Sequence, residues 1–410
     1  MQKDYEKAYA ELIIKKGVAL KKDQEVFLVS SVETYAFARK IVECAYENGA
    51  KKVTVLYTDE QVTRQRFLHE DEIGISHIEK WEIAQRDIIA DNKCAYICIL
   101  SESPDAYVDC DANKVVALSR ARHKAFVKFY DMSKGNVFKW CLVGYPSTSW
   151  ANKVFPNDEN AYEKLKMRIF EAMRLTEQDP IKAWEEHGEC LKKSYTYLNK
   201  MQFDEFRYKN SLGTNLSVGM CKNYLFAGGG EDTVDGEHFI ANMPTEEVFS
   251  APHKLKVNGT VYSSMPLIHN GQSVEDFYFE FKDGKVVSYG AKSGKEVLEG
   301  ILTTDNGSSY LGEIALVAYD TPIRKMNTLF YNTLFDENAS CHFALGSAYT
   351  CSVEGADKMS KEEQEKVGLN YSLEHVDFMI GTSDLEIFGV KDGKEYPIFK
   401  NGNWALNFEK

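Results

Sequence analysis

The chain has 410 residues, which is long enough for two domains, and 44% of them are hydrophobic, enough to build a substantial core. The formal net charge of −13 argues against nucleic acid as a partner, because a phosphate backbone is bound by a basic surface. No uninterrupted apolar run approaches the length of a membrane span, and the polar residues 1–10 lack the apolar core of a secretion signal.

The nine cysteines are scattered singly along the chain, and no C-x-x-C pair occurs among them. In a chain without a secretion signal, such a distribution is typical of reduced thiols rather than of a disulfide framework. We therefore expect a cytoplasmic protein that has neither a membrane nor a nucleic acid as its partner.

Short apolar runs and helical patterns alternate through the first half of the chain. Residues 32–48 and 111–125 have helical spacing, and buried strands are predicted around them. These strands are expected at 25–30, 52–57, 95–100 and 140–145. Continuous apolar strands separated by helices indicate a mainly parallel sheet that helices cover on both faces.

This first half resembles a Rossmann-like layout, but the phosphate-binding sequences are missing. No G-x-G-x-x-G follows the first strand, and no G-x-x-x-x-G-K-S/T occurs, so a dinucleotide or phosphate-loop site is not expected. Two long helices, predicted at 160–175 and 180–201, end this half. They place the domain boundary near residue 200 and predict domains at 1–200 and 201–410.

The sequence pattern of the second half is typical of an α+β domain. The runs 276–281 and 285–289 resemble strands, and four dipeptides are typical of hairpin turns. These dipeptides are Asn258-Gly259, Asp283-Gly284, Asp392-Gly393 and Asn401-Gly402. We expect a C-terminal domain with a few helices and a largely antiparallel sheet.

The stretch 373–381, with the sequence L-E-H-V-D-F-M-I-G, alternates between apolar and polar residues. This period of two predicts a strand with one buried face, on which His375 and Asp377 point the same way. An imidazole and a carboxylate on neighbouring pleats are ready ligands for a divalent metal ion. Taken alone, the pattern is more often a strand with two ordinary polar residues on its wet face.

Three stretches upstream carry the same kind of chemistry. The first, 242–252, contains the adjacent pair Glu246 and Glu247. In the second, 310–317, Glu313 interrupts an apolar run, an unusual place for a carboxylate unless something pairs with it. The third, 334–349, carries His342 and Tyr349, which would share one face two turns apart if this stretch is helical.

Each of these residues also has a purely structural explanation. The pair Glu246-Glu247 could be solvated, and Glu313 could form an ion pair with a lysine. His342 could be a core histidine, and Tyr349 could serve only in packing. Considered together, five of the candidates supply three carboxylates and two imidazoles, which can hold two divalent ions around a bridging water. They are Glu247, Glu313, His342, His375 and Asp377.

The remaining histidines have no comparable acidic neighbours, and His238 and His253 are the reserve candidates because they lie near the first of these stretches. The sequence also lacks H-E-x-x-H, G-x-S-x-G and the set of kinase motifs. A mixed carboxylate and imidazole set accepts zinc, cobalt, manganese or magnesium, so the identity of the metal stays open.

The order and spacing of four motifs resemble the thermophilic metallo-aminopeptidase family of aminopeptidase T, AmpS and PepS. The motifs are N-M-P-T-E-E-V-F-S-A-P, L-G-E-I-A-L-V, F-Y-N-T-L-F-D-E-N-A-S-C-H-F-A-L-G-S-A-Y and H-V-D-F-M-I-G. The resemblance runs the whole length of the chain. It implies a cytoplasmic exopeptidase that removes N-terminal residues from peptides with two divalent ions, built as a homodimer with an N-terminal α/β domain and a C-terminal metal domain.

Carried over by position, the resemblance makes Glu247, Glu313, His342, His375 and Asp377 the metal ligands and Tyr349 a catalytic tyrosine. By analogy with other two-metal aminopeptidases, Glu246 is the candidate general base. On a regular strand Glu246 and Glu247 would face opposite ways. The pairing therefore requires an irregular bend at 244–245, and without one Glu313 is the better candidate for the base.

Two other classes of function stay open at this point. The first is a different two-metal hydrolase, such as an amidase or esterase, that uses the same residues. The second is a binding protein in which the cluster is a structural metal site. The carboxylate-rich composition argues against the second class, because structural zinc sites favour closed, cysteine-rich tetrahedra.

Overall fold

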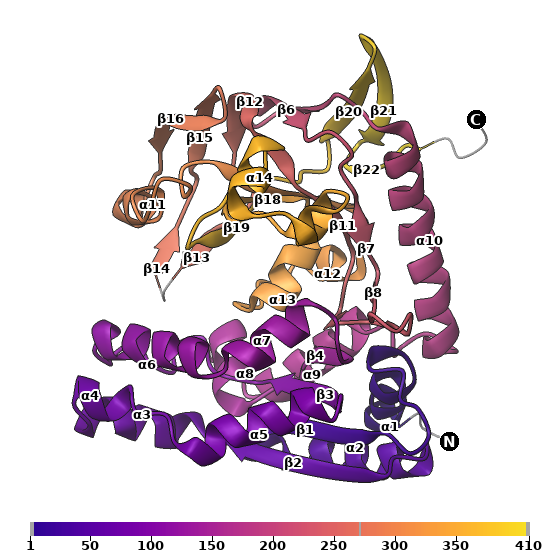
Figure 1. Cartoon of the computed structure of the whole chain (residues 1–410), viewed down its shortest axis with the longest axis vertical. Helices are drawn as coiled ribbons and strands as arrows, with labels where there is room; N and C mark the ends of the chain where they lie inside the picture. The colour runs from indigo at the N-terminus through magenta and orange to yellow at the C-terminus, as the bar shows by residue number, and fades with distance from the viewer. Residues whose placement is uncertain (1–3, 270–271, 407–410) are drawn as a thin grey trace. The chain divides into compact units, whose positions relative to one another are not determined.

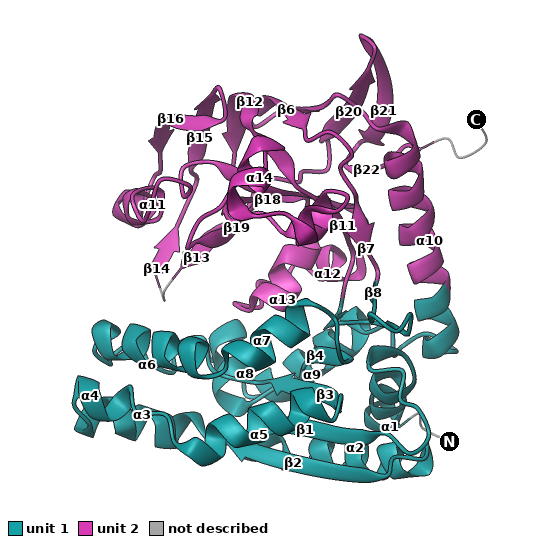
Figure 2. Ribbon diagram, viewed as in Figure 1, with its two compact units in different colours: residues 1–185, 230–244 teal, residues 186–229, 245–410 magenta. Residues whose placement is uncertain are grey.

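The computed structural model describes residues 4–269 and 272–406, and the chain divides into two compact units, shown in Figures 1 and 2. Unit 1 comprises residues 1–185 and 230–244, and unit 2 comprises residues 186–229 and 245–410. Across the described residues, no helix is both long and apolar enough to cross a membrane.

Two segments lie in a different unit from the one that the ranges 1–200 and 201–410 assign to them. The part of α10 (Pro180–Met201) beyond residue 185 belongs to unit 2, because Leu191 and Leu198 are buried in the apolar core of that unit. Residues 230–244 belong to unit 1, because their strand β10 (Asn242–Met243) pairs in parallel with β4 (Trp140–Gly144). Both assignments depend on contacts between distant segments, which a local pattern does not encode.

Unit 1 contains a five-stranded parallel sheet in the order β10-β4-β3-β1-β2. The strands are β1 (Glu25–Ser31), β2 (Lys52–Thr58), β3 (Ala95–Leu100), β4 (Trp140–Gly144) and β10 (Asn242–Met243), with a small hairpin of β8 (Glu231–Asp232) and β9 (His238–Phe239). Consecutive residues of β1 from Val26 to Ser30 are buried, so both faces of the sheet are covered. The predicted α/β architecture of this half is confirmed.

The helices of unit 1 follow the predicted alternation. They are α1 (Tyr5–Leu12), α2 (Tyr35–Glu47), α3 (Glu60–His69), α4 (Glu72–Ile75), α5 (Lys80–Asp91), α6 (Ala112–Ala125), α7 (Val127–Lys134), α8 (Thr148–Val154) and α9 (Ala161–Ala172). Amphipathic spacing explains how they pack, since Phe37, Ile41 and Ala45 of α2 are all buried.

Unit 2 contains two large antiparallel sheets and a two-stranded antiparallel sheet of β13 and β14. An eight-stranded sheet has the order β16-β15-β12-β6-β5-β20-β21-β22, and a five-stranded sheet has the order β19-β18-β17-β11-β7. The strands are β5 (Glu205–Lys209), β6 (Asn215–Met220), β7 (Ala227–Gly228), β11 (Glu247–Ser250), β12 (Pro252–Tyr262), β13 (Leu267–His269), β14 (Gln272–Val274), β15 (Tyr278–Lys282), β16 (Lys285–Gly290), β17 (Leu311–Val317), β18 (His342–Gly346), β19 (His375–Met379), β20 (Glu386–Lys391), β21 (Lys394–Lys400) and β22 (Asn403–Trp404). The short helices are α11 (Lys295–Leu302), α12 (Pro322–Lys325), α13 (Thr333–Asp336) and α14 (Lys361–Lys366).

Aromatic side chains from the two sheets meet in one apolar core. The ring of Phe378 on β19 lies 5.1 Å from that of Phe279 on β15, and Phe343 on β18 lies 4.9 Å from Tyr208 on β5. One face of the five-stranded sheet is therefore buried against the larger sheet. The polar side chains of the five-stranded sheet therefore lie on its opposite face.

One expectation for this half is wrong, and the helical alternative considered for 334–349 does not apply. The dipeptide Asn258-Gly259 is not a turn but lies inside β12, where Gly259 has φ +115° and a Cβ there would stand 2.2 Å from the carbonyl oxygen of Asn215. The stretch 334–349 is not one helix, because α13 ends at Asp336 and His342 begins the strand β18. The other three predicted turn dipeptides do connect consecutive strands.

Candidate metal centre

One face of the five-stranded sheet gathers the polar residues that the sequence singled out. Ala344 of β18 lies opposite Glu313 of β17 on one side and opposite Asp377 of β19 on the other. Residues two positions apart on a strand share a face, so His342 and His375 project to the same side as these carboxylates. The period-two prediction for His375 and Asp377 agrees with this register.

The strand β11, which follows β17 in the sheet, adds a further carboxylate to this face. Glu247 lies opposite Val317, which is four positions from Glu313 and therefore on the same face of β17. Between the polar residues the face carries two small side chains, Ala315 opposite His342 and Ala344 in the middle of β18. These alanines leave room above the strands in the centre of the cluster.

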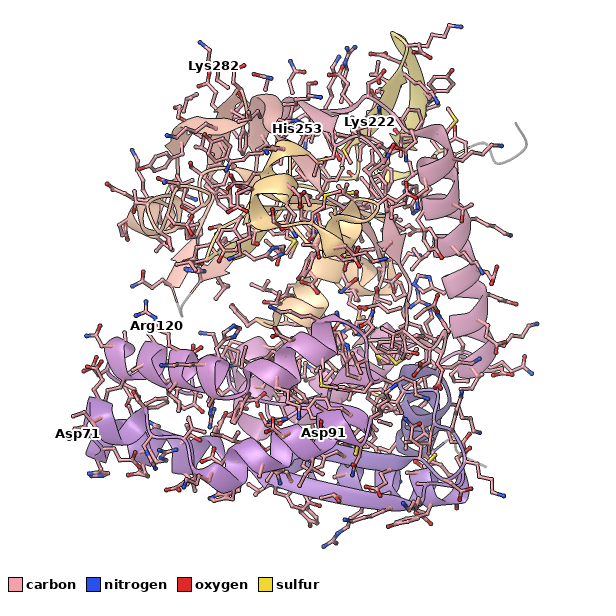
Figure 3. All side chains as sticks on the ribbon, in the orientation of Figure 1. Asp71, Asp91, Arg120, Lys222, His253 and Lys282 are labelled. Carbon is pink, nitrogen blue, oxygen red and sulfur yellow. The ribbon has the colours of Figure 1, made fainter. Side chains whose placement is uncertain are left out.

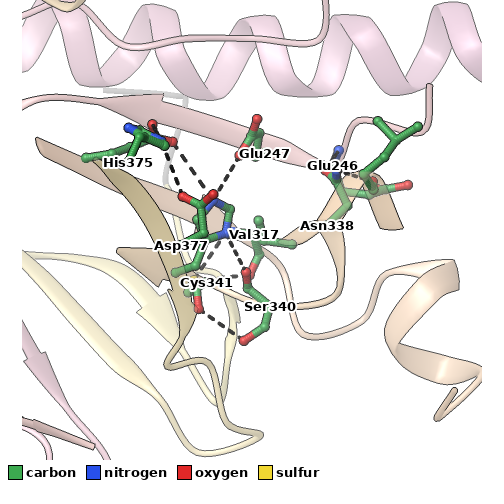
Figure 4. Close-up of polar contacts among 11 residues, drawn as sticks. Glu246, Glu247, Val317, Asn338, Ser340, Cys341, His375 and Asp377 are labelled. Atoms are coloured by element: carbon green, nitrogen blue, oxygen red, sulfur yellow. Dashed lines mark hydrogen bonds and ion pairs between the residues drawn. The ribbon is translucent and has the colours of Figure 1, made fainter. Parts of the chain in front are cut away.

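The nitrogen and oxygen atoms of the cluster form two overlapping groups, part of which is drawn in Figure 4. His342 Nε2 lies 3.2 Å from Glu247 Oε2 and 3.9 Å from Glu313 Oε1. His375 Nε2 lies 3.4 Å from Glu313 Oε2 and 3.4 Å from Asp377 Oδ1. Within each group the possible ligand atoms all lie within 4.8 Å of one another, and Glu313 belongs to both groups.

Backbone carbonyl groups fix the orientation of both imidazole rings. The hydrogen-bond network assigns a proton to Nδ1 of His342, which donates to the carbonyl oxygen of Ser340 at 3.0 Å. In the same way, His375 Nδ1 donates to the carbonyl oxygen of Ser347 at 2.8 Å. Each Nε2 atom is thereby left facing the carboxylates, which is the orientation that metal-ligating histidines adopt.

The carboxylates dominate the electrostatics of the cluster. Burial acts to lower the pKa of His342, but the hydrogen bond and charge of Glu247, with Asp377 and Glu313 nearby, raise it to about 10. Burial likewise opposes the effect of Asp377 and Glu313 on His375, whose pKa is raised to about 11. Burial, followed by the repulsion of Glu247, raises the pKa of Glu313 although His375 acts against it.

The donor set fits divalent cations. Glu313 is only 4% exposed, and its Oε2 atom makes no well-oriented hydrogen bond to any described residue. A buried carboxylate that has only imidazole neighbours and no well-oriented hydrogen bond is costly, and a bound cation is the usual compensation. The residues present therefore match a metal site in chemistry, orientation and charge.

The side chains of Glu246 and Glu247 point in different directions, as expected for adjacent residues at the start of a strand. A bend at Pro244 precedes β11, and Glu246 is buried beside Asn338, whose Oδ1 accepts the backbone N–H of Glu246 at 2.6 Å (Figure 4). The Glu246 carboxylate lies 3.5 Å from Nε2 of His187, which also contacts the carbonyl oxygen of Thr245. The role of His187 was missed, because nothing in the sequence links it to a glutamate 59 positions away.

Tyr349 follows the end of β18 and is 50% exposed. Its ring centroid lies 5.1 Å from that of His375 and 5.8 Å from that of Phe249. Partial burial of the phenol, assisted by the charges of Glu313, Asp377 and the other carboxylates of the cluster, raises its pKa.

Glu337 is a further carboxylate at this face that the ligand set predicted from the sequence did not include. Burial, with the repulsion of Glu247 and Asp377, raises its pKa well above the ordinary value. The attraction of His342 acts in the opposite direction. In the sequence, only the adjacent acids at 336 and 337 indicate that a further carboxylate could lie near the site. Asp336 instead accepts the backbone N–H groups of Phe330 and Asn332, which is a structural role.

The two reserve histidines lie outside the two candidate ligand groups. His253, labelled in Figure 3, is on β12, and its Nδ1 accepts the backbone N–H of Leu255. His238 belongs to unit 1 and pairs with Asp232 at 2.9 Å. Both therefore have local partners.

The sequence matches the family model of thermophilic metalloproteases (M29) over residues 2–404. Aminopeptidase AmpS of Bacillus subtilis is 41% identical over 401 residues, which cover 97% of this chain and 98% of that protein. Aminopeptidase 2 of Geobacillus stearothermophilus is 40% identical over 401 residues, or 97% of each chain. The structure of AmpT from Thermus thermophilus matches with a TM-score of 0.92 and 36% identity, covering 98% of this chain and 99% of that one.

The chain belongs to the thermophilic metalloprotease family M29 and is a metal-dependent aminopeptidase. The family resemblance and the fold predicted from the sequence are both confirmed. A 2,5-dihydroxypyridine dioxygenase from Pseudomonas putida also matches, with a TM-score of 0.53 and 10% identity, which shows a shared fold alone. Details of the reaction must therefore be argued from the site rather than from the fold.

Proposed function

We propose that this chain hydrolyses the N-terminal peptide bond of peptides with a free amino terminus, using two divalent cations held on the face of the five-stranded sheet. The observation that carries the proposal is the pair of ligand groups that share Glu313. One group adds Glu247 and His342, and the other adds His375 and Asp377. Two adjacent sites with a common carboxylate are the arrangement that two-metal hydrolases use.

The balance of charge supports two ions rather than one. The three carboxylates of the two ligand groups carry three negative charges when ionised. They are Glu247, Glu313 and Asp377. One divalent cation would leave part of this charge uncompensated in a buried place, whereas two would compensate all of it.

When bound, such cations supply Lewis-acid activation of water and of the scissile carbonyl group. The protein orients the ligands through the Ser340 and Ser347 carbonyl groups, so that each imidazole presents Nε2 to the cluster. Its side chains also supply the proton transfers. Zinc, cobalt, manganese and magnesium all suit this donor set.

Tyr349 is proposed to donate a hydrogen bond to the oxyanion of the tetrahedral intermediate. A tyrosine phenol holds its proton at neutral pH and can therefore donate this hydrogen bond. The contact of its ring with His375 places it next to the second ligand group. A donor that acts only on the transition state raises kcat more than it lowers KM.

Glu246 remains the proposed general base, because Glu313 belongs to both ligand groups and is needed there as a ligand. To take a proton from water, the Glu246 carboxylate has to turn from His187, which lies 3.5 Å away. The variant Glu246→Gln keeps the size of the side chain and removes the base. Its kcat should fall by about 10² to 10⁴ with unchanged metal content, and full activity would move the role to Glu337.

The direct test of the proposed function compares leucyl anilide with its N-acetylated form on chelated enzyme and on enzyme reloaded with one metal at a time. Release from the free-amine substrate only, and only after reloading, is the expected result. Efficient cleavage of the blocked substrate would instead indicate another metal-dependent hydrolase. Absence of any turnover, with unfolding on chelation, would indicate a structural metal site.

Cytoplasmic residence and a homodimer are further parts of this proposal that come from the family resemblance. The nine scattered cysteines support residence in a reducing compartment. Light scattering on the purified protein measures its mass directly. A mass near that of one chain would contradict the dimer.

A further inference from the structure

The hydroxyl group of Tyr349 has no hydrogen-bond partner among residues 4–269 and 272–406. The residue follows the last residue of β18 by three positions and immediately precedes the short 3-10 helix Thr350–Ser352, so it lies outside regular secondary structure. Half of its surface is exposed. Something other than a hydrogen bond must therefore keep this ring in one place if the hydroxyl is to serve as an oriented donor.

Two aromatic contacts take that role. The ring of His375 lies 5.1 Å from the ring of Tyr349 at an interplanar angle of 59°. The ring of Phe249 lies 5.8 Å away in an edge-to-face arrangement at 61°. The contact with His375 is tilted and the contact with Phe249 is edge-to-face, and together they restrict the ring of Tyr349 more than either would alone.

The position of Phe249 is itself fixed by the sheet that carries the ligands. It lies on β11 two residues after Glu247, and its partner across the strands is Ala315 of β17. Ala315 in turn lies opposite His342. Phe249 therefore stands on the ligand-bearing face, and the small side chain of Ala315 beside it leaves the ring free to reach Tyr349.

Phe249 differs in kind from the other ring that holds Tyr349. His375 has its Nδ1 atom committed to the carbonyl oxygen of Ser347 and its Nε2 atom directed at Glu313 and Asp377, so it cannot be changed without changing the candidate ligands. Phe249 has no atom that binds a metal ion. It is the part of the support that can be altered while the ligand set stays intact.

We propose that Phe249 is a positioning residue that acts on the reaction through Tyr349, by holding the tyrosine ring where its hydroxyl meets the developing oxyanion. This inference rests on the proposed function of the cluster and extends it to a residue outside the ligand set. No part of Phe249 needs to touch the substrate. Its effect should therefore disappear when the hydroxyl that it positions is removed.

The test is a double-mutant cycle on the metal-loaded enzyme with leucyl and alanyl anilides. Phe249→Leu keeps an apolar side chain but removes the ring, and we expect kcat to fall about tenfold with KM and metal content unchanged. In the Tyr349→Phe background the same change should cost less than twofold, because the tyrosine hydroxyl is absent. Phe249→Tyr keeps the ring and should retain kcat within about twofold, which serves as the matched control.

Equal losses in both backgrounds would overturn the inference, because Phe249 would then act independently of Tyr349. A loss that differs between leucyl and alanyl substrates would also overturn it and would indicate a direct contact with the substrate side chain. Failure of the proposed aminopeptidase function would give a different experimental result. The unmodified, metal-loaded enzyme would then release nothing from either free-amine substrate, and both proposals would fall together.

Discussion

At the scale of single residues, Glu313 is the most informative position in the cluster. It interrupts the apolar strand β17, is almost fully buried, and belongs to both groups of candidate ligands. Burying a carboxylate is unfavourable unless cations compensate it. Each of the other ligands serves one group only, so the two kinds of position should respond differently to substitution.

We expect Glu313→Gln to lose most of both ions, whereas Glu247→Gln should retain about one ion per chain, because the group of Glu313, His375 and Asp377 stays complete. Both variants should lose at least about a hundredfold in activity. Metal content measured by atomic emission after gel filtration checks the difference. Glu280→Gln, an exposed change on β15, is the matched control, and equal metal loss in the two site variants would contradict the shared role of Glu313.

Removing the hydroxyl of Tyr349 tests the proposed oxyanion donor. In Tyr349→Phe the ring and its contact with His375 persist, so the ligands should stay in place. We expect kcat to fall by about 10² to 10³ while KM changes little, because the lost interaction forms mainly in the transition state. Tyr371→Phe removes the hydroxyl of another exposed tyrosine and should leave both constants unchanged. A rise in KM alone would assign Tyr349 to substrate binding.

At the scale of elements, the cluster depends on the small residues of strand β18, which lies between β17 and β19. Ala344 lies between Glu313 and Asp377, and Gly346 lies opposite His375 with φ +105°. A Cβ at position 346 would stand 2.2 Å from the carbonyl oxygen of Glu374. The strand therefore leaves space above its centre and permits a close approach of β19 at its end.

Ala344→Val should keep the strand, since β-branched residues suit a pleated sheet, while its two added methyl groups enter the space between Glu313 and Asp377. We expect metal affinity to fall at least about tenfold with only a modest change in the thermal midpoint. Titration with a metal indicator and calorimetry measure the two effects separately. Unchanged metal affinity would show that the ions do not lie above Ala344.

Short sequence patterns within single strands could predict some of the site residues and not others. His375 and Asp377 share a face because of local alternation, and Glu313 is conspicuous in an apolar run, so both were accessible from short patterns. His342 needed the family resemblance, because its stretch does not distinguish a strand from a helix until it pairs with β17 and β19. The contact of Glu246 with His187 depends on packing between distant segments, which no short pattern encodes.

Glycine shows the limit of turn rules in the same way. The Asp283-Gly284 dipeptide forms a hairpin turn, whereas Asn258-Gly259 lies inside β12. In both places the glycine has a positive φ. The difference is that Gly259 is needed for close approach of the backbone to Asn215 on β6, a tertiary cause that the dipeptide does not reveal.

At the scale of the whole molecule, metal binding is linked to protons. In chelated protein the carboxylates raise the pKa of His342 to about 10 and that of His375 to about 11, so both rings carry a proton at neutral pH that an ion bound at Nε2 must displace. A raised pKa stabilises the folded chelated protein below pH 6.5, and this stabilisation is lost as the pH rises toward 10 and 11. Metal affinity should therefore increase with pH.

The expected consequence is that the difference in thermal midpoint between loaded and chelated protein grows from about pH 6.5 to pH 9. Calorimetric scans at constant ionic strength measure it, and an indicator dye in weakly buffered solution counts the protons released on loading. A difference that does not change with pH, together with no proton release, would show that the ions do not bind the two imidazole rings.

Chelation also distinguishes a catalytic from a structural metal site for the molecule as a whole. The apolar side of the five-stranded sheet packs against the larger sheet through rings such as Phe279, Phe343 and Phe378, and this core contains none of the candidate ligands. The core should therefore keep unit 2 folded when the ions are removed. A ligand present at a hundred times its dissociation constant contributes only about 2.7 kcal/mol to stability.

We accordingly expect chelated protein to show an unchanged far-ultraviolet circular dichroism spectrum, a thermal midpoint lowered by several degrees, and no activity toward leucyl anilide. Adding metal back should restore both the midpoint and the activity. Loss of the folded spectrum on chelation would mean that the cations, rather than the apolar core between the sheets, hold unit 2 together. The candidate ligands lie on the face opposite that core, which is the physical reason to expect the folded spectrum to persist.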